Sequence, residues 1–221
     1  LGGNRFRPFL AMLGYEAFCK SYNQTIANRI AVSVECFHKA SLIHDDIEDN
    51  DDSRYGKETI NAEYGIPIAI NTGDLLIGEG YRLIAESEFS PEVVRDCMLI
   101  VSRGHHSLSI GQGAELYATR QGKILPVVDT LKVFENKTSA AFKVALLLGA
   151  TVGEADKETL SILDRFSHNI GIAYQIKDDL SDYLGEKGDI EIQRFSILRS
   201  LLFEKIPDIE KQKLLDSSKN D

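Results

Sequence analysis

The sequence predicts an all-α protein, a bundle of long helices joined by short turns. Apolar residues recur at steps of three and four along several long segments, which is the spacing of a helix that buries one face. No segment alternates apolar and polar residues as a half-buried strand does. The 221 residues, 43% of them hydrophobic and 27% charged, are enough for one domain with a sizeable core.

The individual helices can be placed by their periodicity and their starting residues. The first stripe follows helical steps through Ile26, Ile30, Val34, Phe37, Ser41 and His44. A second helix starts at Ser90-Pro91-Glu92, because serine caps free backbone N–H groups and proline fits the first turn. The segments 138–148 and 159–183 repeat the helical pattern.

The composition excludes several classes of protein. A net charge of −9 without basic clusters argues against nucleic acid as a partner. The three cysteines are isolated and odd in number, which indicates reduced thiols and a cytoplasmic location. No apolar run reaches the roughly 20 residues of a transmembrane segment. The chain begins with Leu1, so we expect an N-terminal piece to precede it.

An acidic run, HDDIEDNDD at residues 44–52, begins where the stripe from Ile26 ends. Asp45 and Asp49 are four residues apart, so on a helix their side chains share a face. The C-terminal end of a helix carries partial negative charge, which repels carboxylates unless a cation neutralises them. A solvated acidic loop is the alternative interpretation of such a run.

A second acidic pair, Asp178 and Asp182, has the same spacing in YQIKDDLSDY, at the end of another predicted helix. Carboxylate oxygens suit Mg²⁺, which takes few protein ligands and completes its shell with water and substrate phosphates. Two copies of D-D-x-x-D favour two helices that face each other and hold Mg²⁺ against a diphosphate, over two solvated helix ends.

The helix face that precedes Asp45 carries Ser41, Phe37 and Val34 at successive turns. A charged head at the acids with a hydrocarbon tail along this face describes an isoprenoid diphosphate. Ordinary core packing is the alternative for each apolar position taken alone.

Five motifs resemble those of the trans-type polyprenyl diphosphate synthases, in the family's order, from Gly2 to about Leu198. They are GGNRFRP, DDIEDNDDSRYG, GQGAEL with Glu115 in place of the family's aspartate, the pair Lys137-Thr138, and YQIKDD. The resemblance implies the all-α isoprenoid synthase fold around a central cavity, three Mg²⁺ ions per active site and a homodimer. It also implies one domain over residues 1–221, without its N-terminal helix and part of its C-terminus.

The resemblance assigns roles to residues of both acidic motifs and of the segments around them. Mg²⁺ would be bound by Asp45, Asp49 and Asp178, with support from Asp46, Asp179 and Asp182. The allylic diphosphate would be held by Arg54, Lys137, Thr138 and Gln175, and isopentenyl diphosphate by Arg7 and His38. The expected catalytic residues are Asp45, Asp49, Asp178 and Lys137.

Besides Glu115, the sequence departs from the family pattern in three places. Asn4 replaces a lysine and Tyr55 replaces the second of two arginines, so the isopentenyl diphosphate site has two fewer cations. Each charge-assisted contact is worth about 1.5–3 kcal/mol, so we expect weak binding of this substrate. The loop after Asp182 is short, and Lys187 and Arg194 are the candidates for its two phosphate-binding lysines.

The activity implied is the condensation of isopentenyl diphosphate with an allylic diphosphate to a trans-polyprenyl diphosphate. Ala40 and Ser41 are too small to stop chain growth early, so Phe37, one turn or about 5.4 Å deeper, is the expected floor for a product of about C20. Two alternatives remain open at this point. One is a terpene-synthase-like enzyme that ionises an allylic diphosphate without isopentenyl diphosphate, and the other is a non-catalytic partner subunit of a prenyl synthase.

Overall fold

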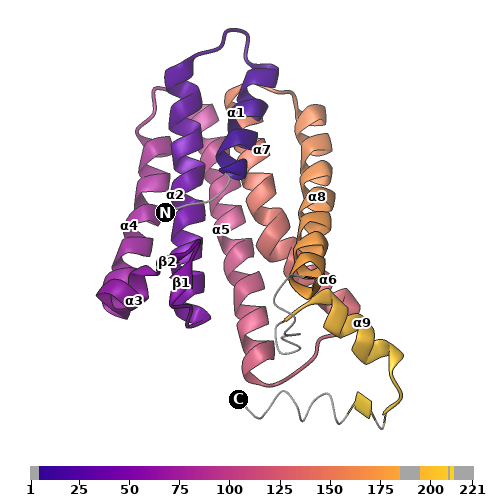
Figure 1. The fold of residues 1–221 in the computed structure, drawn as a ribbon. Helices are drawn as coiled ribbons and strands as arrows, with labels where there is room; N and C mark the ends of the chain where they lie inside the picture. Colours follow the sequence, from indigo (N-terminus) through magenta and orange to yellow (C-terminus); the bar gives the residue numbers. More distant parts are fainter. Residues whose placement is uncertain (1–4, 185–194, 209, 212–221) are drawn as a thin grey trace. The chain divides into compact units, whose positions relative to one another are not determined.

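The computed structural model describes residues 5–184, 195–208, 210 and 211, without the side chains of Asp182 and Leu184 (Figure 1). The all-α class is confirmed, since most of the described residues are helical and the two strands have two residues each. In order, the elements are α1 (Phe6–Phe18), α2 (Gln24–Glu48), β1 (Ser53–Arg54), β2 (Lys57–Glu58), α3 (Ile60–Tyr64), α4 (Ile66–Ala85), α5 (Pro91–Arg120), α6 (Val127–Phe134), the π-helix η1 (Glu135–Ser139), α7 (Ala140–Val152), α8 (Lys157–Leu184) and α9 (Ile197–Lys205).

The chain divides into two compact units. Unit 1 comprises Leu1–Gly104 and Ala141–Arg165, and unit 2 comprises His105–Ala140 and Phe166–Asp221. The chain passes from one unit to the other within α5, at the start of α7 and within α8.

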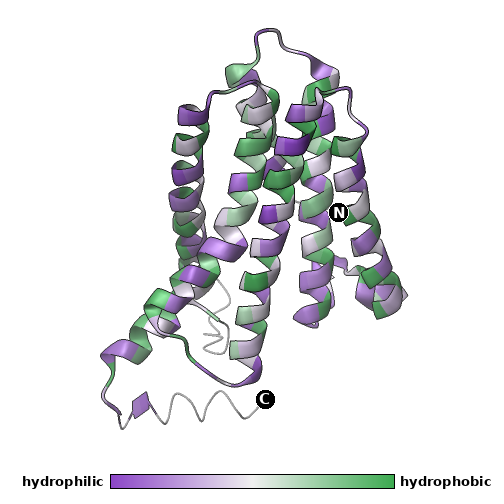
Figure 2. Cartoon of the chain, turned by 180° about the vertical axis from the view of Figure 1, so that it is seen from behind, coloured by the Kyte–Doolittle hydropathy of each residue, from purple (hydrophilic) through white to green (hydrophobic). Residues whose placement is uncertain are grey.

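Helix starts follow the capping residues of the sequence. The side chain of Asn23 accepts hydrogen bonds from the backbone N–H groups of Thr25 and Ile26, at 2.9 and 3.3 Å, and α2 begins there. The hydroxyl of Ser90 accepts from the N–H of Val93 at 3.3 Å, which confirms the predicted start of α5. Figure 2 shows hydrophobic and hydrophilic residues on the same helices, the pattern that made them recognisable in the sequence.

In unit 1, α2 is the central helix and packs against α1, α3 and α4. Its apolar residues Ile30, Val34, Ala40 and Ile43 are buried. Against α4 the fit is close at Gly80, where a Cβ would lie 2.8 Å from the ring of Phe37. This glycine lets α4 approach α2, and the hydroxyl of Ser33 donates to its carbonyl at 2.8 Å.

Two local features differ from the sequence prediction. Residues 53–58 form a small antiparallel hairpin, although no strand was expected. Its turn residues, Tyr55 and Gly56, have φ values of 53° and 73°, as a two-residue hairpin turn requires. The helix predicted over 138–148 is also preceded by η1, so that Thr138 and Ser139 lie in a π turn rather than in α-helix.

In unit 2, η1 lies against α8 and α9 packs against α6. A Cβ on Gly171 of α8 would lie 2.4 Å from the Cα of Ser139, and the Ser139 hydroxyl donates to the carbonyl of His168 at 2.8 Å. This close approach accompanies the widened π turn. None of the helices that the structure describes is long and apolar enough to cross a bilayer.

Candidate active site

The first acidic motif lies at the C-terminal end of α2. The N–H of Asp49 donates to the carbonyl of Asp45 at 2.8 Å, and the backbone of Asp49 is still helical. The predicted spacing of one turn is therefore confirmed for these two residues. Asp49 is exposed and Asp45 is half-buried, so both carboxylates can be reached from the solvent.

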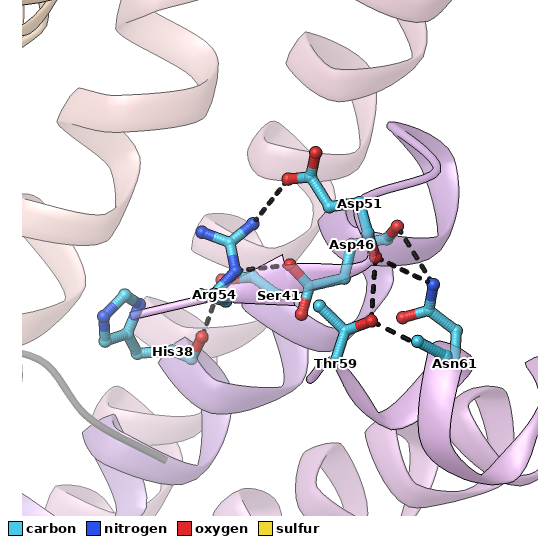
Figure 3. Close-up of polar contacts among 8 residues, drawn as sticks. His38, Ser41, Asp46, Asp51, Arg54, Thr59 and Asn61 are labelled. Carbon is cyan, nitrogen blue, oxygen red and sulfur yellow. Dashed lines mark hydrogen bonds and ion pairs between the residues drawn. The ribbon is translucent and has the colours of Figure 1, made fainter. Parts of the chain in front are cut away.

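Asp46, between these two, is turned into the protein. Its side chain forms an ion pair with the Nε of Arg54, whose Nη2 lies 3.4 Å from a carboxylate oxygen of Asp51 (Figure 3). Only 4% of Asp46 is exposed, and this burial raises the pKa of its carboxyl while Arg54 opposes the shift. The predicted diphosphate residue Arg54 is thus oriented by two carboxylates of the acidic run.

The loop that follows α2 is fastened by two residues that the sequence analysis missed. The hydroxyl of Thr59 donates to the carbonyl of Asp51 at 2.7 Å, and the amide of Asn61 donates to the same carbonyl at 3.1 Å (Figure 3). Thr59 is also the N-cap of α3, where it accepts from the N–H of Ala62 at 3.3 Å. A threonine before a short helix is the signal that could have revealed it.

Arg7 and His38, the residues predicted to hold isopentenyl diphosphate, lie together in unit 1. The Nη1 of Arg7 lies 3.3 Å from Nδ1 and 3.2 Å from Nε2 of the imidazole, and its guanidinium lies 5.7 Å from the ring centre of Phe142. Burial, together with the positive charges of Arg7, Lys39 and Arg54, lowers the pKa of His38 to about 3. The imidazole is therefore neutral, and Arg7 carries the positive charge of this pair.

Of the two substituted positions, Tyr55 lies among the described residues. Tyr55 is 60% exposed in the hairpin turn, next to Arg54. Asn4 lies outside the described residues, as do Lys187 and Arg194.

The predicted chain-length residues lie in the middle of α2. Phe37 is half-buried and meets Tyr81 of α4 edge to face, with ring centres 5.0 Å apart. Ala40 is buried, whereas Ser41 is half-buried and turns its hydroxyl back to the carbonyl of His38 at 2.9 Å. The contacts with α4 show that Phe37 takes part in helix packing, and its role as the floor for the product stays a prediction.

Three of the predicted allylic diphosphate residues lie in unit 2, Lys137 and Thr138 on η1 and Gln175 on α8. The amine of Lys137 donates to the carboxylate of Glu115 on α5 at 3.1 Å, and the hydroxyl of Thr138 donates to Oε1 of Gln175 on α8 at 2.7 Å. Glu115, in place of the family's aspartate, still reaches the lysine of the K-T pair.

In the second acidic motif, as in the first, the first aspartate is more exposed than the second. Asp178 is exposed, whereas its neighbour Asp179 is buried and accepts hydrogen bonds from Gln175 and from the backbone of Ile197. Asp182 follows Asp178 by one turn of α8, and its side chain lies outside the described residues.

The donor set suits Mg²⁺ better than a metal that needs a complete protein cage. Among the described residues no group of three or more His, Cys, Asp and Glu side chains could hold a metal ion by itself. In unit 1, Asp45 and Asp49 supply two carboxylates on one helix face, and in unit 2 Asp178 supplies an exposed one. Mg²⁺ characteristically takes one or two carboxylates and fills its shell with water and substrate phosphates, so each motif fits it by itself.

Known proteins resemble this chain along almost its whole length. The model of the polyprenyl synthetase family matches residues 1–213. Farnesyl diphosphate synthase of Escherichia coli is 34% identical over 194 residues, which cover 84% of this chain and 64% of that protein. Geranylgeranyl diphosphate synthase of Methanosarcina mazei is 33% identical over 182 residues, covering 82% of this chain and 55% of that protein.

Solved structures give the same result for the fold. Geranylgeranyl pyrophosphate synthetase from Pyrococcus horikoshii superposes with a TM-score of 0.89 at 29% identity, over 97% of this chain and 67% of that one. An FPP/GFPP synthase from Zymomonas mobilis superposes with a TM-score of 0.80 at 28% identity, over 98% of this chain and 76% of that one. The expected isoprenoid synthase fold is therefore confirmed. With its motifs, its helices and these relatives in agreement, the chain belongs to the polyprenyl synthetase family.

Proposed function

We propose that this chain carries the active site of a Mg²⁺-dependent prenyltransferase, which condenses isopentenyl diphosphate with an allylic diphosphate to a trans-polyprenyl diphosphate of about C20. The observation that carries the proposal is the pair of D-D-x-x-D motifs at the C-terminal ends of α2 and α8, each with its first aspartate open to solvent at least in part. The curated relatives bear the names farnesyl and geranylgeranyl diphosphate synthase, which supports the same reaction.

The first step breaks the bond between the allylic carbon and the diphosphate oxygen. Three Mg²⁺ ions are expected per active site, and Asp45, Asp49 and Asp178 would bind them. These ions would supply positive charge to the leaving diphosphate. Lys137 and Arg54 would hold that diphosphate. Each is already oriented by carboxylates, Glu115 for Lys137 and Asp46 and Asp51 for Arg54.

The second step joins the two substrates. Arg7 and the neutral His38 would hold the diphosphate of isopentenyl diphosphate, Arg7 by charge and His38 by one N–H donor. The double bond attacks the allylic carbocation, a new carbon–carbon bond forms, and a proton is then lost to the released diphosphate. The polyprenyl diphosphate keeps the diphosphate of the isopentenyl unit.

The location and the assembly state belong to the same proposal. Three free cysteines, two of them buried, support a reducing cytoplasmic setting. A homodimer is supported by exposed apolar residues of α4, such as Ile68 and Leu75.

Incubation of the purified protein with Mg²⁺, labelled isopentenyl diphosphate and a series of allylic diphosphates tests the proposal. We expect a labelled prenyl diphosphate from the parent protein and none from Asp45→Ala or Asp178→Ala. Both variants should keep their helical circular dichroism spectrum, because removal of a carboxylate at a helix C-terminus relieves repulsion. Asp52→Ala is the matched control: it removes an exposed acid of the same run that lies outside D-D-x-x-D, and activity should persist.

Two results would overturn the assignment. Consumption of allylic diphosphate without isopentenyl diphosphate, with release of a hydrocarbon or an alcohol, would identify a terpene-synthase-like enzyme. Absence of any turnover by the parent protein, with stimulation of a separate prenyl synthase, would identify a partner subunit.

A further inference from the structure

Neighbouring aspartates of the second acidic motif face in different directions. Successive residues of an α-helix are about 100° apart, so the side chains of Asp178 and Asp179 leave the helix in different directions. Asp178 is exposed, whereas Asp179 is only 8% exposed. The two residues therefore have different surroundings within unit 2.

Both carboxylate oxygens of Asp179 are engaged by the protein. Oδ1 accepts a hydrogen bond from the amide nitrogen of Gln175 at 3.1 Å, one turn earlier on α8. Oδ2 accepts from the backbone N–H of Ile197 at 2.7 Å. Ile197 is the first residue of α9, so the carboxylate satisfies one of the free N–H groups there and faces the positive end of the helix.

The contact with Asp179 also determines how Gln175 is turned. An ionised carboxylate only accepts hydrogen bonds, so the NH₂ group of the Gln175 amide must face it. The amide oxygen then faces the other way, toward Thr138 of η1, whose hydroxyl donates to it at 2.7 Å. Without the carboxylate, nothing in this chain of contacts would distinguish the two orientations of the amide.

Within unit 2, contacts join α8 to α9, α9 to α6, and η1 back to α8. The α9 helix held by Asp179 is also fastened to α6, through a hydrogen bond of 2.7 Å between the buried hydroxyls of Thr130 and Ser200. A second contact joins the N–H of Val127 to the carboxylate of Glu204 at 2.9 Å. Since α6 continues directly into η1, these contacts connect α9 to the elements on both sides of the Thr138–Gln175 contact.

We propose that Asp179 is a positioning residue and not a metal ligand. It ties the N-terminus of α9 to the end of α8 and orients Gln175 and Thr138 for the allylic diphosphate. The part that concerns the diphosphate rests on the proposed function, whereas the anchoring of α9 does not. The first motif provides an independent parallel, because its second aspartate, Asp46, is likewise buried and engaged by another element.

Amide hydrogen exchange of the substrate-free protein tests the anchor without any assumption about catalysis. In Asp179→Ala we expect exchange at Ile197 and the following residues of α9 to become about tenfold faster or more, because α9 loses a buried charged acceptor. Asp178→Asn should leave this exchange unchanged. Unaltered exchange in Asp179→Ala would refute the anchor, whatever reaction the protein catalyses.

Steady-state kinetics at varied Mg²⁺ test the positioning role. Asp179→Asn keeps an oxygen that can accept from Ile197, so α9 should stay protected, but its NH₂ group allows Gln175 to turn over. We therefore expect a several-fold higher KM for the allylic substrate and an unchanged Mg²⁺ concentration for half-maximal rate. A rise in that Mg²⁺ concentration as large as in Asp178→Asn would make Asp179 a metal ligand and overturn the proposal.

Ser196→Ala is the matched control. It removes the side-chain cap of α9, which accepts from the N–H of Arg199 at 3.3 Å, but leaves Asp179 and Gln175 untouched. Exchange in α9 should quicken in this variant while the KM for the allylic substrate stays as in the parent. An equal rise of KM in Ser196→Ala and Asp179→Asn would show that α9 stability alone sets substrate binding, and would refute the orientation of Gln175 by Asp179.

Discussion

At the scale of single residues, Phe37 takes part in helix packing and is also the proposed floor for the product. Its ring contacts α4 at Tyr81 and would meet a Cβ on Gly80, so its removal leaves space between α2 and α4. We expect Phe37→Ala to give longer products, because a growing chain could extend past this turn of α2. Chromatography of the products from one allylic substrate measures the change.

The control for this prediction is Val32→Ala, which shortens an exposed apolar residue of the same helix. Products of Phe37→Ala no longer than those of the parent would remove Phe37 from the role of floor and leave it as a packing residue. A lower Tm is expected in either case, because large-to-small changes at packed sites cost stability.

His38 makes the stability of the protein depend on pH. Its pKa is lowered from 6.5 to about 3, by burial and by the positive charges of Arg7 on α1, Lys39 on α2 and Arg54 on β1. Between these two values the unfolded chain binds more protons than the folded one. The contribution of His38 to the free energy of unfolding is therefore at its maximum above pH 6.5. It falls on acidification, by up to about 1.4 kcal/mol per pH unit.

Denaturant unfolding of the parent and of His38→Gln between about pH 7.5 and pH 4.5 checks this prediction. The glutamine does not titrate. The free energy of unfolding of the parent minus that of the variant should therefore fall as the pH is lowered. Other titrating groups are common to both and cancel in the difference. Parallel curves would show that His38 is not held neutral in the folded protein.

At the scale of elements, the loop after α2 depends on α3 for its position. Thr59 caps α3 and holds the carbonyl of Asp51, so one hydroxyl joins the helix to the acidic run. We expect Thr59→Val to lower the free energy of unfolding by about 1–2 kcal/mol, as the loss of a cap does. Because the loop carries Asp49 and Arg54, this variant should also need more Mg²⁺ for half-maximal turnover.

Thr59→Ser keeps the hydroxyl and is the control for that variant. It should retain the Mg²⁺ dependence of the parent and most of its stability. Thr59→Val could instead lower the stability and leave the Mg²⁺ dependence unchanged. That result would show that the cap stabilises α3 but does not position the acidic motif.

The sequence predicts those elements whose cause is local. The stripe from Ile26 and the start at Ser90-Pro91 predict α2 and α5, because periodicity and capping act within a few residues. The one-turn spacing of Asp45 and Asp49 is predictable for the same reason. These parts of the fold and of the candidate site need no knowledge of distant neighbours.

The remaining features depend on residues that are distant in sequence. Thr138 meets Gln175 across 37 positions and Asp179 meets Ile197 across 18, so the anchoring of α9 has no local signature. The π turn at η1 likewise accompanies its close contact with Gly171. On α8, the apolar residues Ile162 and Phe166 lie one helical turn apart, yet both are about half exposed, since periodicity alone does not say what a face covers.

At the scale of the whole molecule, the net charge of −9 opposes the binding of the proposed substrates, which are anionic. The overall field repels a diphosphate, so binding must come from local cations such as Arg7, Arg54 and Lys137, and from Mg²⁺. The acidic motifs add to the repulsion until Mg²⁺ neutralises them, which makes the metal a condition for substrate binding as well as for reaction in the proposed mechanism.

The outer face of α4 is the feature that bears on assembly. Ala69, Gly73, Gly80 and Ile84 are the buried residues of this helix, and α4 packs on α2. Ile68 and Leu75, seven residues apart, lie on the opposite side and are 51% and 67% exposed. A helix that is apolar on opposite sides is expected to be covered on both, and a second copy of the chain is the partner that the proposed homodimer supplies.

We therefore expect the double variant Ile68→Glu/Leu75→Glu to lose self-association, since each glutamate would place a charge in an apolar interface. Light scattering after size-exclusion chromatography should give a dimer mass for the parent and a monomer mass for the variant. Val128→Glu, at a residue of α6 that is 59% exposed, tests whether any added surface charge has this effect and should leave the dimer intact. A parent that is already monomeric at micromolar concentration, or a double variant that still dimerises, would exclude this face of α4 as the interface.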